Sequence, residues 1–349
     1  LIVRLEDAAG KVGYGEAAPI PGFGPETAAT DASVLAGFGG RLDEKHLARI
    51  PGELGCLRNA LAAAIATARQ PDGPAAFPDY LPVAALLPAG RVALRRVETL
   101  AEAGFRVFKW KVGVDDAEDE LALLDDLCAV LPHGARLRLD ANGAWDRRRA
   151  ERWLERSAER PVEYVEQPCL AESSLGAAGR RKVEDILLGL AADYPTPVAL
   201  DESLVNDGDI ERWIGAGWPG IFVMKPLLSA DLDATMRKLA AAKAEVVFSS
   251  TLETAVGAAM ALRAAFAWAG KAGSTNSADS ARSPQASSPQ VGSPGAISAG
   301  ARSHQSRAWG GGGVSVVADR RFDGPSAAPF LHREDVERIN PAALWTALN

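Results

Sequence analysis

Two lysines stand two positions apart in a strand-like stretch, residues 105–113. The period of two along a strand places Lys109 and Lys111 on the same face. Neighbouring ammonium groups repel each other and partial burial disfavours each charge, so both effects lower a lysine pKa toward the range of a general base. The alternative is an edge strand with a solvated lysine face, since lysines are mostly surface residues.

Charged residues also close the strand-like runs that follow. Asp140, Glu166 and Asp201 each end one run, and Lys225 ends the next. The carboxyl ends of the strands of a parallel barrel share one mouth, so these side chains are expected to converge there. Acids so close together repel unless a cation lies between them, and carboxylate oxygens suit Mg²⁺. Each acid alone could instead cap a helix or join a loop ion pair, but charges on successive strands favour a shared site.

This set of groups indicates proton abstraction alpha to a carboxylate. A divalent metal stabilises the enediolate that forms when the α-proton leaves. A lysine on one side removes the proton, and a lysine on the other side donates a proton or offers positive charge. Racemisation, cycloisomerisation and dehydration share this step, so the residues alone leave the choice among them open.

The elements that must position these groups follow a β/α rhythm. Strand-like runs alternate with helical stretches, which predicts a parallel sheet, and eight such units close a TIM-type barrel. A doubly wound open sheet is the alternative, but it needs a glycine-rich phosphate turn after its first strand, and residues 83–90 offer one glycine. The predicted strands are 83–87, 106–111, 136–140, 163–166, 198–201, 220–225 and 245–250, and the predicted helices are 92–103, 118–130, 147–156, 181–193, 208–216, 231–242 and 254–268.

Composition divides the chain into four parts. A hairpin of strands 1–5 and 12–16 and two alanine-rich helices, 27–37 and 57–69, are predicted to form a small α+β capping domain that ends at a connector containing Pro and Gly. A Ser/Gly/Pro-rich stretch later in the chain lacks large apolar residues, which predicts a disordered insertion, with an active-site lid as the alternative. The predicted parts are 1–80 for the capping domain, 81–271 for the barrel, 272–307 for the insertion, and 308–349 for the last barrel strand, at 314–317, and the C-terminal segment, in which 333–348 are predicted to form one or two short helices.

The overall composition excludes several classes of function. The formal net charge is −7, which argues against a nucleic-acid partner. Three scattered cysteines and four separated histidines disfavour a disulfide framework, a histidine metal site and a Ser-His-Asp triad. No apolar run reaches transmembrane length, so we expect no membrane partner and a cytoplasmic location. The sequence carries no signal for a particular oligomeric state.

The charged positions and their neighbours resemble the muconate-lactonising branch of the enolase superfamily. That branch carries Lys-x-Lys on its second barrel strand, then Asp, Glu and Asp metal ligands, then Lys on the sixth strand. The resemblance covers about 1–268, and the segments 165–168 and 247–254 are most similar to the o-succinylbenzoate synthase family. All six positions match, as Lys109, Lys111, Asp140, Glu166, Asp201 and Lys225.

The resemblance implies a cytoplasmic, Mg²⁺-dependent lyase, with Mn²⁺ as a substitute metal. This family dehydrates the small-molecule carboxylate 2-succinyl-6-hydroxy-2,4-cyclohexadiene-1-carboxylate in menaquinone or phylloquinone biosynthesis. Lys111 would abstract the proton and return it to the departing hydroxyl, because the elimination is syn. Lys109 would tune that lysine and hold the substrate carboxylate, and Lys225 would stabilise the enediolate from the other face. The resemblance also implies Asp140, Glu166 and Asp201 as metal ligands and Asn142 as a residue that supports the metal site or the substrate. Ser249, Ser250 and Thr251 would contact the succinyl group or, alternatively, satisfy strand-end backbone groups.

Two further hypotheses remain at this stage. The first is a related enzyme on the same scaffold: an N-succinylamino acid racemase, a dipeptide epimerase or a muconate cycloisomerase. The second is an inactive, truncated metal-binding barrel. It is motivated by two departures from the family pattern: a strand and covering loop expected upstream of Leu1, and the insertion at 272–307 just before the last barrel strand.

Overall fold

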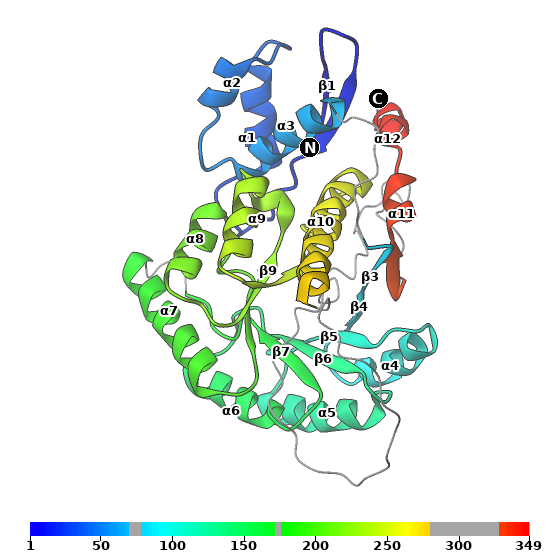
Figure 1. Ribbon diagram of the computed structural model, residues 1–349. Helices are drawn as coiled ribbons and strands as arrows, with labels where there is room; N and C mark the ends of the chain where they lie inside the picture. Colours follow the sequence, from blue (N-terminus) through cyan, green and yellow to red (C-terminus); the bar gives the residue numbers. More distant parts are fainter. Residues whose placement is uncertain (70–77, 172–175, 280–327, 349) are drawn as a thin grey trace.

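A computed structural model describes residues 1–69, 78–171, 176–279 and 328–348. The N-terminal unit sits above one end of a curved parallel sheet, whose outer side is covered by helices (Figure 1). The C-terminal helices lie beside the N-terminal unit, so both ends of the chain are near the same side of the molecule.

The N-terminal unit is a hairpin packed on a long helix. Strands β1 (Ile2–Glu6) and β2 (Val12–Glu16) pair antiparallel, which confirms the predicted hairpin. Helix α3 (Gly55–Arg69) lies so close to β2 that a Cβ on Gly13 or Gly15 would come within 1.9 Å of a helix carbonyl oxygen. Only glycine fits there. The other two helices are α1 (Ala28–Ala36), which was predicted, and α2 (Glu44–Arg49), which was not.

Seven parallel strands form the main sheet in strict sequence order, from β4 at one edge to β10 at the other. In a doubly wound sheet the strand order reverses part-way along the sheet, and here it does not. The TIM-type β/α prediction is therefore confirmed, and the alternative is wrong. Every predicted strand from 83 to 250 is present. The strands are β4 (Ala84–Leu87), β5 (Val107–Lys111), β6 (Arg136–Asp140), β7 (Val162–Glu166), β8 (Val198–Leu200), β9 (Ile221–Met224) and β10 (Glu245–Phe248).

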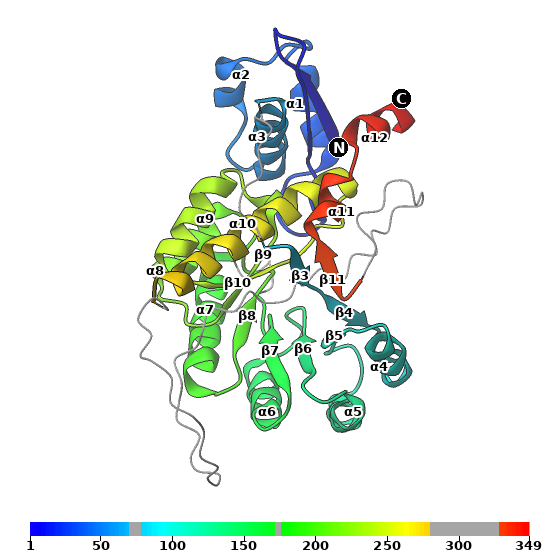
Figure 2. The same cartoon turned by 45° about the vertical axis from the view of Figure 1, so that its right-hand side comes forward.

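Helices follow the strands and cover the convex side of the sheet (Figure 2). Side chains alternate along each strand, so one set packs under the helices and the other points into the barrel. Trp110 and Trp153 belong to the helix-side core, whereas Tyr164 and Val223 belong to a separate cluster inside the barrel. The helices are α4 (Val92–Glu102), α5 (Ala117–Val130), α6 (Arg147–Ser157), α7 (Gly176–Asp193), α8 (Asp207–Gly215), α9 (Leu232–Ala241) and α10 (Ala255–Asp279), with the 3-10 turn η2 (Pro226–Leu228) after β9.

Among the described residues, β4 and β10 form the two edges of the main sheet. The eighth strand predicted at 314–317 lies outside the described residues. Helix α10 continues to Asp279, past the boundary predicted at 271, and the rest of the predicted insertion also lies outside the described residues. The C-terminal segment adds β11 (Phe330–His332), which pairs with β3 (Tyr80–Pro82), and the predicted short helices α11 (Arg333–Glu337) and α12 (Pro341–Leu348).

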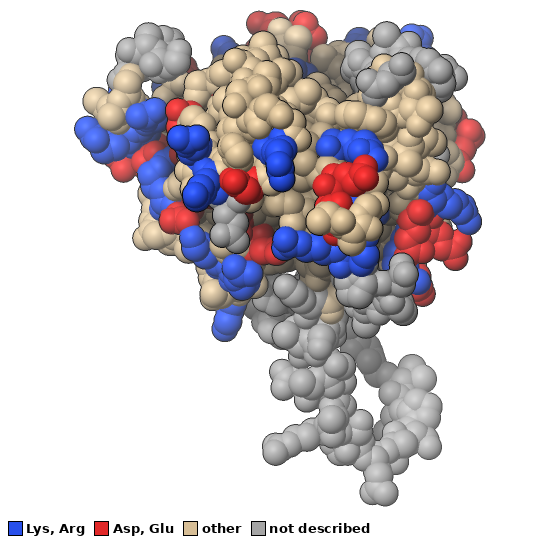
Figure 3. Space-filling view, turned by 90° about the horizontal axis from the view of Figure 1, so that it is seen from above, with Lys and Arg blue, Asp and Glu red and all other residues tan. Residues whose placement is uncertain are grey.

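The face of the molecule seen from above carries Lys and Arg side chains interspersed with Asp and Glu side chains (Figure 3). Among the residues that the structure describes, every helix is too short or too polar to span a bilayer.

Candidate active site

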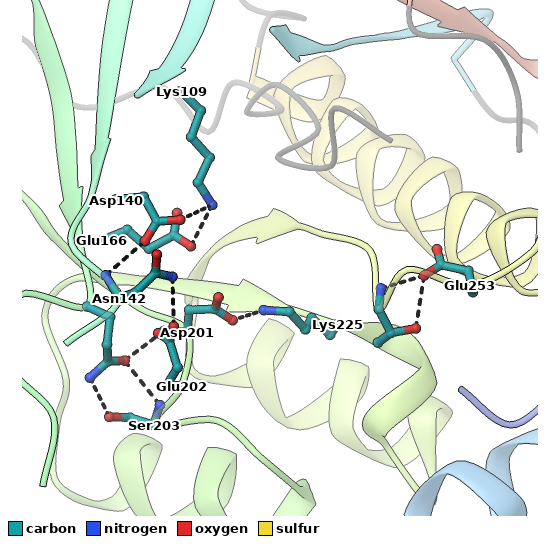
Figure 4. Close-up of polar contacts among 11 residues, drawn as sticks. Lys109, Asp140, Asn142, Glu166, Asp201, Glu202, Ser203, Lys225 and Glu253 are labelled. Carbon is teal, nitrogen blue, oxygen red and sulfur yellow. Dashed lines mark hydrogen bonds and ion pairs between the residues drawn. The ribbon is translucent and has the colours of Figure 1, made fainter. Parts of the chain in front are cut away.

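Side chains from the carboxyl ends of β5, β6 and β7 meet inside the barrel. Lys109 Nζ lies 2.8 Å from Glu166 Oε1 and 2.9 Å from Asp140 Oδ2 (Figure 4). The sheet register places Lys111, Asp140 and Glu166 level with one another on adjacent strands. Lys109 lies two residues before Lys111 on the same face of β5, and its long side chain reaches both carboxylates. Side chains two positions apart on a strand point to the same face, so Glu166 points into the barrel as Tyr164 does.

A second ion pair lies across the mouth. Lys225, directly after β9, donates to Asp201 Oδ1 from the end of β8 (Figure 4). Both side chains are at least nine-tenths buried. The structure therefore brings five of the six predicted charged positions into two buried lysine–carboxylate groups, Lys109 with Asp140 and Glu166, and Lys225 with Asp201.

Lys109 and Lys111 share a face of β5 but not an environment. Lys109 is 9% exposed, whereas Lys111, at the strand end, is exposed. Burial opposes the charge of Lys109, but Glu166 and Asp140 outweigh it and raise the pKa of this lysine above its ordinary value. The expectation that paired lysines would each have a lowered pKa is therefore wrong for Lys109, because the carboxylates lie closer to it than the sequence could indicate.

The opposite shift occurs at Lys225. Burial lowers the pKa of Lys225 to about 8, and the attraction of Glu166 offsets only part of this effect. Burial, with Asp140 nearby, also raises the pKa of Glu166 above the usual carboxyl range.

The donor set fits a hard divalent cation in its chemistry. Glu166 Oε2, Glu202 Oε2 and Asn142 Oδ1 are buried oxygens for which the structure gives no hydrogen-bond partner. Buried acceptors of this kind are costly unless a cation or a donor reaches them. As placed, no three acidic, His or Cys side chains among the described residues form a ready metal cluster. The ammonium groups hold the carboxylates instead, so a metal ion would have to draw Asp140, Glu166 and Asp201 away from Lys109 and Lys225.

Asn142 was predicted to contact metal or substrate. Its backbone N–H donates to Asp140 Oδ1 at 3.2 Å, and its side-chain Nδ2 donates to Glu202 Oε1 at 2.9 Å (Figure 4). Its φ of 45° lies in the left-handed region, which Asn tolerates better than most residues. Asn142 thus links the ends of β6 and β8, and Glu202 is a site residue that the sequence analysis missed.

Gln167 is a second residue that the sequence analysis missed. It is fully buried and follows Glu166 with a left-handed φ of 37°. Its Oε1 accepts from the backbone N–H groups of Asp201 and Ser203 at 3.0 and 3.1 Å. Its Nε2 donates to Cys169 O and Ser203 Oγ, both at 2.8 Å. One amide therefore fixes the β8 end relative to the β7 end; its position next to Glu166 was the only signal in the sequence.

The predicted substrate hydroxyls lie after β10. Ser249 and Thr251 are buried, and Ser250 is half-buried. Thr251 Oγ1 donates to Glu253 Oε2 at 2.9 Å, and the Thr251 backbone N–H donates to the same oxygen (Figure 4). Burial raises the pKa of Glu253. Glu253 therefore holds Thr251 in place and was also missed by the sequence analysis.

The capping domain reaches this part of the mouth. The ring of Phe23 lies under Lys225, with Nζ 5.0 Å from the ring centroid, a cation–π distance. Asn59 of α3 donates to Pro226 O at 3.0 Å and Ser229 O at 2.7 Å, immediately after Lys225. Both contacts join residues that are far apart in the sequence, so no local pattern predicted them.

Comparison with known proteins agrees with this geometry. The family described as enolase C-terminal domain-like matches residues 92–295. The chain is a member of the enolase superfamily. The o-succinylbenzoate synthase of Thermosynechococcus vestitus is 40% identical over 262 residues, which cover 73% of this chain and 77% of that protein. The hydrophobic dipeptide epimerase of Roseobacter litoralis is 31% identical over 58% of this chain and 60% of that protein.

Crystal structures of enolase-superfamily enzymes are similar to this structure. The o-succinylbenzoate synthase of Thermosynechococcus elongatus BP-1, complexed with Mg in its active site, aligns with a TM-score of 0.66 and 38% identity, over 76% of this chain and 81% of that one. Muconate cycloisomerase from Pseudomonas fluorescens aligns with a TM-score of 0.64 over 75% of this chain and 78% of that one. At 22% identity, this second likeness supports the fold alone.

Proposed function

We propose that this chain is an o-succinylbenzoate synthase, a lyase that removes water from 2-succinyl-6-hydroxy-2,4-cyclohexadiene-1-carboxylate to form 2-succinylbenzoate. The observation that carries the proposal is the buried pairing of Lys109 with Asp140 and Glu166, opposite Lys225 with Asp201. It occurs in a chain that is 40% identical to an enzyme of this name. The product belongs to menaquinone or phylloquinone biosynthesis.

The metal of this enzyme is Mg²⁺, for which Mn²⁺ is a chemically similar substitute. We assign it to Asp140, Glu166 and Asp201, because their carboxylates end three adjacent strands on the inner side of the sheet. A bound Mg²⁺ supplies positive charge that stabilises the enediolate form of the substrate carboxylate. The unpartnered Glu166 Oε2 supports this assignment, since it leaves a buried ligand position free.

The lysines carry the proton transfers. Lys111 is the assigned base: it takes the α-proton, and the C–H electron pair passes into the carboxylate to give the enediolate. When the enediolate collapses, this pair forms the new double bond and the C–O bond breaks, while the Lys111 ammonium gives its proton to the departing hydroxyl, which leaves as water from the same face. Lys109, held as an ammonium by its two carboxylates, keeps positive charge beside the base and the substrate carboxylate. Lys225 faces the intermediate from the other side of the mouth.

Substrate contacts are assigned to the loop after β10 and to Asn142. Ser249, Ser250 and Thr251 are proposed to contact the succinyl group, and the buried position of two of them supports this. Asn142 Nδ2 donates to Glu202, which supports a positioning function for this residue. Its Oδ1 has no hydrogen-bond partner and could accept from a ligand.

The enzyme acts on a small molecule, and we propose that it does so in the cytoplasm. Cys56, Cys128 and Cys169 are free thiols, which fits a reducing compartment.

Turnover by wild-type protein and by the Lys111→Ala variant tests the proposal. The diene absorbance of the substrate should fall with the wild type only when Mg²⁺ is present. Loss of the base should lower kcat about 100- to 10,000-fold. Lys238→Ala is the control, because this exposed lysine pairs with Glu211 on the outer helices. Wild-type protein without Mg²⁺-dependent turnover would contradict the proposal.

Isotope exchange separates dehydration from racemisation on the same scaffold. A racemase or epimerase uses lysines on both faces as proton carriers, whereas the dehydration needs only Lys111. In a synthase, Lys225→Ala should therefore still exchange the substrate α-proton with deuterated solvent on the Lys111 side. Exchange and epimerisation of N-succinylamino acids or dipeptides, without dehydration of the diene, would favour the racemase or epimerase hypothesis.

A further inference from the structure

A carboxylate of the capping domain is buried against the barrel. Glu16, at the end of β2, is 4% exposed. It accepts hydrogen bonds from the backbone N–H of Thr254 at 2.9 Å, from Thr254 Oγ1 at 2.6 Å and from the backbone N–H of Gly257 at 2.8 Å. These partners are the first residues of α10 and the residue before it.

Glu16 acts as a helix cap supplied by another part of the chain. The first N–H groups of a helix lack partners within the helix and lie at its positive end, so a carboxylate there is favoured. Thr254 Oγ1 also accepts from the Val256 N–H at 3.3 Å. A Cβ on Gly257 would lie 2.8 Å from Glu16 Oε2 and 2.7 Å from Glu253 Cβ, so glycine provides the space for this contact.

Thr254, which Glu16 contacts, directly follows the loop 249–253 that carries the proposed substrate hydroxyls. At the start of this loop, the Ser249 N–H donates to Met224 O at 2.9 Å. In its middle, Leu252 is exposed with a left-handed φ of 64°, which costs energy for a side chain of this type. A loop in a strained conformation persists only when both of its ends are held, and Glu16 holds the second end.

We propose that Glu16 is a positioning residue for the substrate: by capping α10 from the capping domain, it sets the loop 249–253 against the succinyl group. The inference rests on the proposed function, since it takes the loop hydroxyls as substrate contacts. Glu16 touches neither the assigned metal ligands nor the base. Its loss therefore weakens substrate binding and leaves the chemical step and metal binding in place.

The test compares Glu16→Gln with variants of its partner. Glu16→Gln keeps the shape but loses the charge, so KM should rise about 10- to 100-fold, as expected for a buried charged hydrogen bond, while kcat stays within about threefold. Thr254→Val removes only the hydroxyl and should raise KM less, whereas Thr254→Ser should behave as wild type. Thr254→Val also carries the test if Glu16→Gln does not fold.

Hydrogen exchange gives a readout that is independent of turnover. The amides of Thr254 and Gly257 should exchange at least about tenfold faster in Glu16→Gln, while the Mg²⁺ concentration that gives half-maximal thermal stabilisation stays unchanged. Asp43→Ala is the matched control, because Asp43 caps α2 by accepting from the His46 N–H at 2.9 Å, away from the barrel mouth. It should lower thermal stability without changing KM.

Two results would overturn the inference: faster exchange at 249–257 with an unchanged KM, or an unchanged exchange pattern in Glu16→Gln. Binding of 2-succinylbenzoate to wild-type protein, measured by calorimetry, separates this failure from that of the proposed function. Wild-type protein that neither binds this product nor turns over the diene would contradict the proposed function itself, and the exchange pattern would still decide whether Glu16 holds the loop.

Discussion

The two halves of the barrel mouth are held in place by different parts of the chain. The acidic half, comprising Lys109, Asp140 and Glu166, is positioned by strand register and by ion pairs within the barrel. The cap-facing half comprises Lys225 and the loop 249–253. In the N-terminal unit, Phe23 contacts Lys225, Asn59 holds the turn after Lys225, and Glu16 holds Thr254, directly after the loop.

This difference separates two tasks. The sheet alone can hold the metal ligands and lysines of the acidic half that are proposed for the proton abstraction, because adjacent strand ends are fixed by backbone hydrogen bonds. The groups proposed to recognise the substrate depend on docking between the N-terminal unit and the barrel. Substitutions in the acidic half should therefore change metal binding, and substitutions at the cap contacts should change kinetics at constant metal affinity.

Lys109→Met should have the largest effect on the acidic half. It leaves Asp140 and Glu166 buried without their ammonium partner, which should cost about 3–5 kcal/mol of unfolding free energy without metal. Added Mg²⁺ should recover more stability in this variant than in wild type, because no ammonium then competes for the carboxylates. Thermal unfolding with and without Mg²⁺ measures both effects, and Lys238→Met is the exposed control. Equal Mg²⁺ responses in variant and wild type would contradict the metal assignment.

Asn59→Ala should have an intermediate effect, confined to the cap-facing half. It leaves Pro226 O and Ser229 O without their donor, at a cost of about 1–3 kcal/mol. Because Lys225 precedes this turn, kcat should fall about tenfold, while the Mg²⁺ midpoint of thermal stabilisation stays at the wild-type value.

Asn340→Ala provides the matched comparison for that variant. Asn340 accepts two backbone N–H groups at 3.1 Å at the start of α12, outside the mouth. It should lose stability without losing kcat. If both variants lowered kcat equally, the contact of Asn59 with the turn after Lys225 would have no special effect on the reaction.

Asp31→Asn should have the smallest effect and leave both halves untouched. Asp31 is fully buried in the N-terminal unit, and burial, with Glu26 nearby, raises its pKa to about 7. A carboxyl whose pKa is raised on folding destabilises the folded state increasingly as pH rises from about 4 to about 7. The unfolding free energy of the variant, relative to that of wild type, should therefore be more than about 1 kcal/mol higher at pH 8 than at pH 5.

Urea unfolding at the two pH values measures this gain, and KM and kcat should not change. A gain of the same size at both pH values would show that Asp31 does not titrate on folding. A changed KM would show that the stability of the N-terminal unit itself, and not its specific contacts, controls the mouth.

Local sequence pattern predicted most of the fold and the acidic half of the site. The period of two along each strand and the alternation of strands with helices depend on neighbouring residues, so they are visible in the sequence. The parallel β/α order then requires that Asp140, Glu166 and Asp201 end on one side of the sheet. The hairpin of the N-terminal unit was predicted for the same reason, from its turn residues and strand patterns.

The remaining features depend on contacts between distant segments. Lys109 and Lys111 look equivalent in the sequence, but only the packed structure places one between two carboxylates and leaves the other exposed. Glu16 and Thr254 are 238 positions apart, and Asn59 and Ser229 are 170 apart. The sequence by itself predicted which charged groups meet at the barrel mouth, because strand periodicity is local. Only the tertiary structure decided which of these groups are buried and paired, because that depends on packing inside the barrel. It also decided which capping residues contact the mouth, because those hydrogen bonds form only when the two units dock.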